Sequence, residues 1–334
     1  MTERENRLNK IRVLDEESFP SYMAEENLTF RKEHIYRSDF SSFDGLSIRY
    51  YKTDKRYKGC IVILHGYCGF FGKFHEMCEI FYRQGYQVFF LEHRGHGYSG
   101  REIDDKDIIH VNDYGDYVED TKIFMDSIVV PESGGKSIHL FGHSMGGAIS
   151  ALFLEKYPGY FKSVIFSSPM FSPRTGNIPK LVTYLLRAKI RLFGEEKKPF
   201  SGGKRFDGVM DFENSCTMSR ARFKYLFDQR IEDEHYHTSM STYGWAASSL
   251  RAVSQLMKNA YKIKLPSLLF IAGNDTLVDP KGQLLFAKKT GNTEVVRFEN
   301  AKHELFNATK EIQEKYYLKI FEFLDKQAIT SQAQ

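Results

Sequence analysis

The sequence has no long apolar run. None of its 334 residues lies in a stretch that approaches the roughly 20 apolar residues of a membrane-spanning helix. Residues 1–26 are polar and charged and lack the apolar core of a secretory signal peptide. We therefore expect a cytoplasmic protein that touches membranes only from the side.

Cysteine is scarce. The four cysteines form no C-x-x-C pair and have no histidine at a spacing typical of metal ligands; they are Cys60, Cys68, Cys78 and Cys216. This pattern indicates free thiols in a reducing compartment and predicts no metal site.

Excess charge is also small, at +4 for the whole chain at pH 7. Such a weak excess argues against nucleic acid as the main partner, although it permits a weak attraction to anionic membrane surfaces. Aromatic residues, by contrast, make up 15% of the chain, with 28 Phe and 20 Tyr. Most aromatic side chains pack in cores, but some can line an apolar binding cleft.

Short apolar runs alternate with helical patterns along most of the chain. The length suits one large α/β domain with an insertion, or two smaller domains. The alternation is typical of parallel βαβ units, whose ligands bind at the carboxyl ends of the strands. The expected strands cover 46–51, 60–64, 87–91, 137–141, 163–166, 267–272 and 294–298. The expected helices cover 74–84, 111–128, 148–156, 281–289 and 309–324.

This alternation stops between residues 171 and 250, where no clear buried strand occurs. The segment contains a basic stretch, 197–205, which is either a solvated face or a surface for lipid headgroups. We interpret 171–250 as a helical cap inserted over the edge of the sheet, and residues 1–40 as a polar leader that packs on the main body. The expected cap helices are 179–192 and 219–227, and the remaining core consists of 1–170 and 251–334.

Residues 142–146 read Gly-His-Ser-Met-Gly, a G-x-S-x-G pattern between an apolar run and a helical one. A strand that turns directly into a helix forces its central residue into a cramped backbone conformation, and flanking glycines remove the Cβ atoms that would clash. The pattern therefore predicts Ser144 as a nucleophile, with the amides of the following helix directed at its target. The alternative is that the pattern is a chance match in an ordinary turn. Only catalytic partner residues elsewhere in the chain can decide between these two interpretations.

An acid and a base for this serine follow two late strands. Asp275 comes directly after the apolar run 267–272 and Gly273, and Asp279 lies four residues further on. We favour Asp275 as the acid because it lies closer to the strand end, and we interpret Asp279 as the cap of the next helix. His303 follows the last expected strand and is the predicted base. The order Ser, Asp, His is the order that α/β-hydrolases use.

The oxyanion produced by attack on a carbonyl needs backbone N–H donors. We assign one to Met145, directly after the nucleophile, and one to Tyr67, in the glycine-containing loop after the run 60–64. The alternative is that His65-Gly66 forms only a turn. His235 and His237, which follow an acidic stretch, are interpreted as a solvated loop rather than a metal site.

Taken together, several motifs resemble the lysophospholipase and monoacylglycerol lipase branch of the α/β-hydrolases. They are GHSMGGAIS at 142–150, HG at 65–66, HRGHGYSG at 93–100, GNDTLVD at 273–279 and AKH at 301–303. The segments 110–114, 168–171 and 219–223 are closer still to bacterial lysophospholipases. The resemblance runs from about residue 30 to residue 325.

This resemblance implies an α/β-hydrolase fold and a cofactor-free serine hydrolase of single-chain lipid esters, with Ser144, Asp275 and His303 as its catalytic residues. It also implies an aromatic and Met-lined substrate pocket, which in this sequence would draw on Tyr67, Phe70, Met170 and Trp245. Acyl-chain and headgroup preference stay open. The alternatives are a short-chain carboxylesterase or related peptidase, a transacylase, and a non-catalytic homologue that only binds a ligand.

Overall fold

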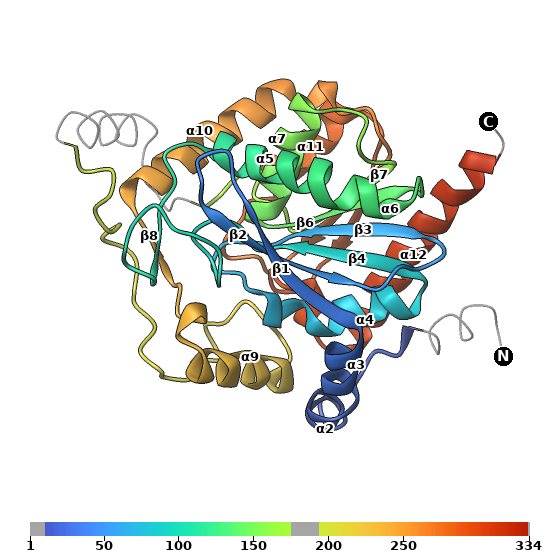
Figure 1. The fold of residues 1–334 in the computed structure, drawn as a ribbon, viewed down its shortest axis with the longest axis horizontal. Helices are drawn as coiled ribbons and strands as arrows, with labels where there is room; N and C mark the ends of the chain where they lie inside the picture. Colours follow the sequence, from blue (N-terminus) through green and yellow to red (C-terminus); the bar gives the residue numbers. More distant parts are fainter. Residues whose placement is uncertain (1–10, 175–193, 333–334) are drawn as a thin grey trace.

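The computed structural model describes residues 11–174 and 194–332. An eight-stranded sheet crosses the molecule in the order β1-β2-β4-β3-β6-β7-β9-β10 (Figure 1). β1 pairs antiparallel with β2, and β2 antiparallel with β4, while all later pairings are parallel. The strands are β1 Ile35–Ser41, β2 Ser47–Thr53, β3 Gly59–Leu64, β4 Tyr86–Leu91, β6 Ile138–His143, β7 Ser163–Ser167, β9 Ser267–Ala272 and β10 Thr293–Phe298.

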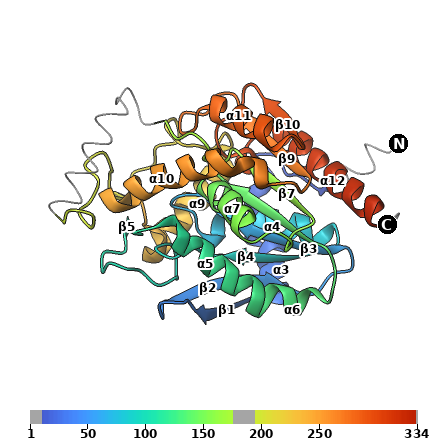
Figure 2. The same ribbon diagram turned by 90° about the horizontal axis from the view of Figure 1, so that it is seen from above.

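Helices cover both faces of this sheet, which confirms the predicted α/β architecture (Figures 1 and 2). One face is packed by α5 Tyr114–Phe124, α7 Met145–Lys156, α10 Tyr243–Asn259 and α11 Pro280–Thr290, and the other by α4 His75–Arg83 and α12 Lys310–Gln332. The remaining α-helices of the described residues are α2 Phe19–Ala24, α3 Glu26–His34, α6 Val130–Ser133 and α9 Arg220–Glu232.

The five central parallel strands, β3, β4, β6, β7 and β9, are buried along their whole length. This burial explains their continuous apolar sequences, because a strand covered by helices on both faces has no polar side. The edge strand β10 is only partly buried and alternates between exposed and half-buried residues.

The N-terminal region is more structured than a polar leader. Two short helices, α2 and α3, precede β1, and all seven residues of β1 pair with β2. The apolar pattern of the sequence does not predict β1, because its residues, IYRSDFS, are mostly polar. Such a sequence suits a strand at the edge of the sheet, where no apolar face is required.

The cap region is described only in part. The expected helix 179–192 lies outside the described residues. The expected helix 219–227 is present as α9. A two-stranded sheet joins β8, Met240–Ser241, to β5, Ile108–Ile109, and so ties this region to the loop after β4.

The order of the strands reverses at β3, which lies between β4 and β6. At such a reversal the connections leave in opposite directions, and the loops at the carboxyl ends of the two strands open a crevice. The loop after β3 begins at His65, and the turn after β6 is Ser144. The topology therefore places the predicted oxyanion loop and nucleophile side by side.

Candidate active site

Ser144 occupies a strained turn between β6 and α7. Its backbone angles are φ 51° and ψ −117°, a conformation that costs a residue with a Cβ of the order of 1–3 kcal/mol. The two flanking glycines explain how the turn closes. A Cβ on Gly142 would lie 2.4 Å from the Ser150 hydroxyl, and one on Gly146 would lie 2.0 Å from the Leu64 carbonyl oxygen. The G-x-S-x-G pattern is thus a packing requirement of α7, against β6 at Gly142 and against β3 at Gly146.

Substituting Gly146 by alanine is expected to lower the free energy of unfolding by about 3 kcal/mol or more, because the added methyl meets backbone atoms of β3 that cannot rotate away. Urea denaturation measures the loss. Gly203→Ala is the matched control, because its Cβ would meet only the flexible Met240 side chain. Equal stability of the two variants would contradict this account of the turn.

A histidine–carboxylate pair lies beside this turn. His303 Nδ1 is 2.6 Å from Asp275 Oδ2, and both residues are buried. The other oxygen of Asp275 accepts the amides of Leu277, at 2.8 Å, and Val278, at 3.0 Å. Burial acts to raise the pKa of Asp275, but the hydrogen bonds from His303 and the two amides outweigh it and leave that pKa below its usual value. The carboxylate is therefore fixed in its charged form.

The free nitrogen of His303, Nε2, is buried and has no hydrogen-bond partner among the described residues. The His303 ring lies 4.9 Å from the ring of His143, the residue before the nucleophile. His143 itself is a poor base: its Nδ1 lies 3.1 Å from the Ser167 carbonyl oxygen, and burial lowers its pKa to about 3. Of the two histidines at this turn, only His303 combines a carboxylate partner with a free nitrogen.

Asp279, the competing acid, caps α11. Its side chain accepts the amide of Lys281 at 2.9 Å. This observation confirms the interpretation of Asp279 as a capping residue.

The predicted oxyanion loop touches the nucleophile turn. A Cβ on Gly66 would lie 3.0 Å from the Cβ of Ser144. A tight turn follows, in which the amide of Gly69 donates to the Gly66 carbonyl at 2.9 Å and Cys68 has a φ of 53°. Tyr67 sits at the corner of this turn, and Met145 is the first residue of α7, where an amide has no partner within the helix. Of the two predicted donors, Met145 directly follows Ser144, and Tyr67 follows Gly66, the residue whose Cβ would meet Ser144.

Glu92, which the sequence does not predict as a site residue, binds the end of the predicted oxyanion loop. It is fully buried, and its carboxylate oxygens accept the amides of Phe71, at 3.3 Å, and Tyr98, at 2.8 Å. Burial raises its pKa from 4.5 to about 7, although both amide hydrogen bonds oppose that shift. The loop is thus fixed by a carboxyl group that changes charge near neutral pH.

A pH dependence of stability follows from Glu92. Because its pKa is higher in the folded chain, its contribution is present below pH 4.5 and is lost as the pH rises through about 7. Relative to Glu92→Gln, which cannot ionise, the wild type should lose about 3 kcal/mol of unfolding free energy between pH 4.5 and pH 8. Denaturant unfolding of both proteins across this range measures the difference, and a constant difference would contradict the assignment.

Of the four expected pocket residues, Met170 contacts Ser144, and Tyr67 and Trp245 contact each other. The Tyr67 and Trp245 rings are 4.7 Å apart, and the amide of Met170 donates to the Ser144 carbonyl at 2.9 Å. Phe70 is buried, and its ring stacks on that of Tyr236, with 4.3 Å between the ring centroids. Phe70 therefore joins the predicted oxyanion loop to the cap region.

The four cysteines are free thiols. Within 11–174 and 194–332, no group of three or more His, Cys, Asp or Glu side chains is arranged to hold a metal ion. His235 Nδ1 instead lies 2.9 Å from Asp233 Oδ1.

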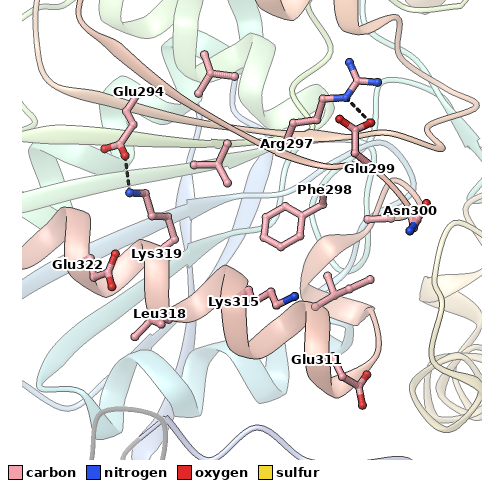
Figure 3. A pocket seen from close by; sticks show the side chains of 14 residues that line it. Glu294, Arg297, Phe298, Glu299, Asn300, Glu311, Lys315, Leu318, Lys319 and Glu322 are labelled. Atoms are coloured by element: carbon pink, nitrogen blue, oxygen red, sulfur yellow. Dashed lines mark hydrogen bonds and ion pairs between the residues drawn. The ribbon is translucent and has the colours of Figure 1, made fainter. Parts of the chain in front are cut away.

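A groove of about 1300 Å³ lies elsewhere, between β10 and α12 (Figure 3). Two ion pairs lie along it: Arg297 Nε lies 2.9 Å from Glu299 Oε2, and Lys319 pairs with Glu294. Neither Ser144, Asp275 nor His303 lines it. The groove is therefore separate from the candidate active site.

The chain is similar in sequence to known proteins. Residues 55–310 match the family described as "Serine aminopeptidase, S33". Lysophospholipase L2 of Escherichia coli (strain K12) is 29% identical over 248 residues, which cover 72% of this chain and 71% of the relative. The monoglyceride lipase homolog of Monkeypox virus is 29% identical over 278 residues, covering 81% and 90% of the two chains.

The fold is also shared with solved structures. A soluble variant of monoglyceride lipase from Saccharomyces cerevisiae superposes with a TM-score of 0.69 at 18% identity, covering 87% of this chain and 94% of that one. At this identity the superposition shows the fold alone. With the family match, which spans most of the sequence, it identifies the chain as a member of the family described as "Serine aminopeptidase, S33" and a serine hydrolase of the α/β-hydrolase fold.

Proposed function

We propose that this protein hydrolyses the carboxylic ester of a single-chain lipid, a lysophospholipid or a monoacylglycerol, through an acyl-enzyme on Ser144. The observation that carries the proposal is the His303–Asp275 pair, joined at 2.6 Å, beside a serine held in a strained strand-to-helix turn. The names of the relatives, a lysophospholipase and a monoglyceride lipase homolog, supply the substrate class.

In the proposed mechanism, Ser144 Oγ attacks the ester carbonyl and passes its proton to His303 Nε2. Asp275 keeps the other proton on Nδ1 and stabilises the imidazolium that forms. The amides of Tyr67 and Met145 receive the oxyanion. His303 then gives its proton to the leaving alcohol as the ester bond breaks. A water molecule next attacks the acyl carbon while His303 takes its proton, and that proton returns to Ser144 Oγ as the acyl–serine bond breaks and the acid is released.

The main alternative is peptide hydrolysis, because the matched family is described as an aminopeptidase family. An aminopeptidase needs a carboxylate to receive the α-ammonium group of its substrate. The carboxylates that flank the candidate site are already engaged: Asp275 pairs with His303, and Glu304 pairs with Lys73 at 2.7 Å. We therefore favour the ester.

A substrate panel separates these functions. The proposal expects turnover of lysophosphatidylcholine or monoacylglycerol with long acyl chains, little turnover of aminoacyl nitroanilides, and none of either by Ser144→Ala. Turnover restricted to acetyl and butyryl esters would indicate a short-chain carboxylesterase. Preferred turnover of the nitroanilides would indicate a peptidase.

We further propose that residues 171–250 cap the candidate site and that the protein works in the cytoplasm. The packing of Trp245, from the start of α10, on Tyr67 supports the first point, although α10 itself continues to Asn259 on the core. The free cysteines support the second. Among residues 11–174 and 194–332, no helix combines the length and apolar character needed to cross a bilayer.

Peripheral contact with a membrane is part of the same proposal. Val209, Met210 and Ile231 are 66%, 49% and 53% exposed, and a Cβ on Gly208 would lie 3.5 Å from Ile231 Cδ1, so these apolar side chains gather beside α9. Most cations of the basic stretch are instead neutralised by local partners, Lys198 by Glu195 at 2.8 Å and Arg205 by Asp107 at 2.9 Å. The contact should therefore be mainly apolar.

The double variant Val209→Asp/Met210→Asp is expected to reduce co-sedimentation with phosphatidylcholine–phosphatidylserine vesicles by about tenfold, since two exposed apolar side chains that would enter the membrane surface are lost. Val295→Asp, at an isolated 38% exposed valine on β10, is the matched control. Unchanged sedimentation of the double variant would refute this surface.

A further inference from the structure

An ion pair outside the proposed catalytic residues joins the two loops that carry them. Lys73 lies in the short helix Phe71–Phe74 that ends the oxyanion loop, and Glu304 directly follows His303. Lys73 Nζ is 2.7 Å from Glu304 Oε1, and the two side chains are only 21% and 9% exposed. The pair spans 231 positions of sequence, so it fixes one loop of the site against the other.

Glu304 is held on several sides. Its second oxygen accepts Asn307 Nδ2 at 3.0 Å, and its amide donates to the Cys216 carbonyl at 3.1 Å. Burial acts to raise its pKa, but the charge and hydrogen bond of Lys73 hold that pKa at about 2. The pKa of Lys73 is raised in turn. Both members are therefore charged throughout the neutral pH range.

The other titratable groups around this pair are either uncharged near pH 7 or already paired with another residue. Burial raises the pKa of the Cys216 thiol to about 12 and lowers that of His143 to about 3, so neither carries charge near pH 7. Asp275 faces His303.

Two further cations lie near this pair, Lys302 in the histidine loop and Arg230 on α9, and both donate to backbone carbonyls. Lys302 Nζ lies 3.0 Å from the Glu213 oxygen, and Arg230 Nε lies 3.0 Å from the Tyr236 oxygen. Among the described groups, Glu304 is thus the direct partner of Lys73, and removing either one leaves a half-buried charge next to the loop of His303.

We propose that Lys73 and Glu304 are positioning residues: the pair locks the oxyanion loop to the histidine loop and keeps the net charge beside the imidazole at zero. The inference rests on the proposed function, because it takes His303 as the base. The proposal predicts opposite effects for the loss of Lys73 and the loss of Glu304. Removing the cation and removing the anion must displace the protonation of the base in opposite directions.

The test is the acid limb of the pH profile of kcat/KM for a nitrophenyl butyrate, which reports the free enzyme. Lys73→Met leaves the carboxylate alone, which favours the imidazolium and should move the acid limb to higher pH. Glu304→Gln leaves the ammonium alone and should move it to lower pH. A single uncompensated and partly buried charge in the loop next to the base predicts a shift of about one pH unit each way.

Rescue and control variants complete the design. The double variant Lys73→Met/Glu304→Gln, which restores neutrality, and Lys73→Arg, which keeps the cation, should both return the limb close to its wild-type position. Lys52→Met breaks a Lys–Glu pair of similar exposure, 26% and 27%, between β2 and α6, and should not move the limb.

The inference would be overturned if the acid limb of kcat/KM moved in the same direction in both variants. It would also be overturned if the limb did not move in folded Lys73→Met and Glu304→Gln proteins. If Lys73→Met does not fold, the sign of the Glu304→Gln shift decides alone. Fluorophosphonate labelling of the wild type separates this failure from failure of the proposed function. A labelled, active wild type with unshifted variants overturns only the pairing, whereas an unlabelled, inactive wild type overturns both.

Discussion

Replacing Ser144 by alanine is expected to lower kcat/KM for a lysophospholipid or monoacylglycerol by about 10⁴-fold or more, because the acyl-enzyme can no longer form. The variant should fold as the wild type does. Alanine carries the same Cβ as serine, so the strain of the turn, with φ 51° and ψ −117°, is unchanged. Initial rates on the lipid ester, with unfolding monitored in parallel, measure both parts of the prediction.

Ser168→Ala is the matched control for this substitution. Like Ser144, Ser168 is buried and has a positive φ, 43°, and its hydroxyl has no partner among the described residues. Its loss should change kcat/KM by less than about threefold, as for a buried hydroxyl outside the reaction path. Residual activity of Ser144→Ala within tenfold of the wild type would show that another group is the nucleophile.

Asp275→Asn is expected to reduce kcat by about 10⁴-fold with little effect on substrate affinity. The amide oxygen of asparagine can still accept the backbone hydrogen bonds from Leu277 and Val278, so the loop should keep its shape. The amide nitrogen, however, would donate to His303 Nδ1. That hydrogen bond holds the proton of the imidazole on Nε2, where the base must be free to accept one.

Asp279→Asn distinguishes the two acids that follow β9. Asp279 caps α11 by accepting the amide of Lys281, and asparagine is an equally good cap. The activity of Asp279→Asn should therefore stay within about twofold of that of the wild type, and its free energy of unfolding should be nearly unchanged. The assignment fails if Asp279→Asn loses activity while Asp275→Asn retains it.

The sequence was most informative where local chemistry allows few solutions. Gly142 and Gly146 bracket Ser144 because any side chain there would meet Ser150 or the backbone of β3, and this requirement is visible as a motif. The apolar runs of the central strands are equally visible, since those strands are covered on both faces.

The sequence was least informative where a strand is polar, or where two interacting residues lie far apart along the chain. β1 is a polar edge strand, so its pattern resembled a leader. Lys73 and Glu304 are ordinary charged residues until folding brings them together across 231 positions. Glu92 directly follows the buried strand β4, but only the structure shows that its carboxyl accepts hydrogen bonds from the amides of Phe71 and Tyr98.

The central claim is that Ser144 is the hydroxyl activated by His303 and Asp275, and covalent labelling with mapping of the modified peptide tests it most directly. A fluorophosphonate should add once per chain, on Ser144, in the wild type and in Lys52→Met, and the rate of labelling should fall by at least about 10³-fold in Asp275→Asn and His303→Ala. An adduct on any other residue, or labelling of Ser144 at the wild-type rate in both of those variants, would contradict the account.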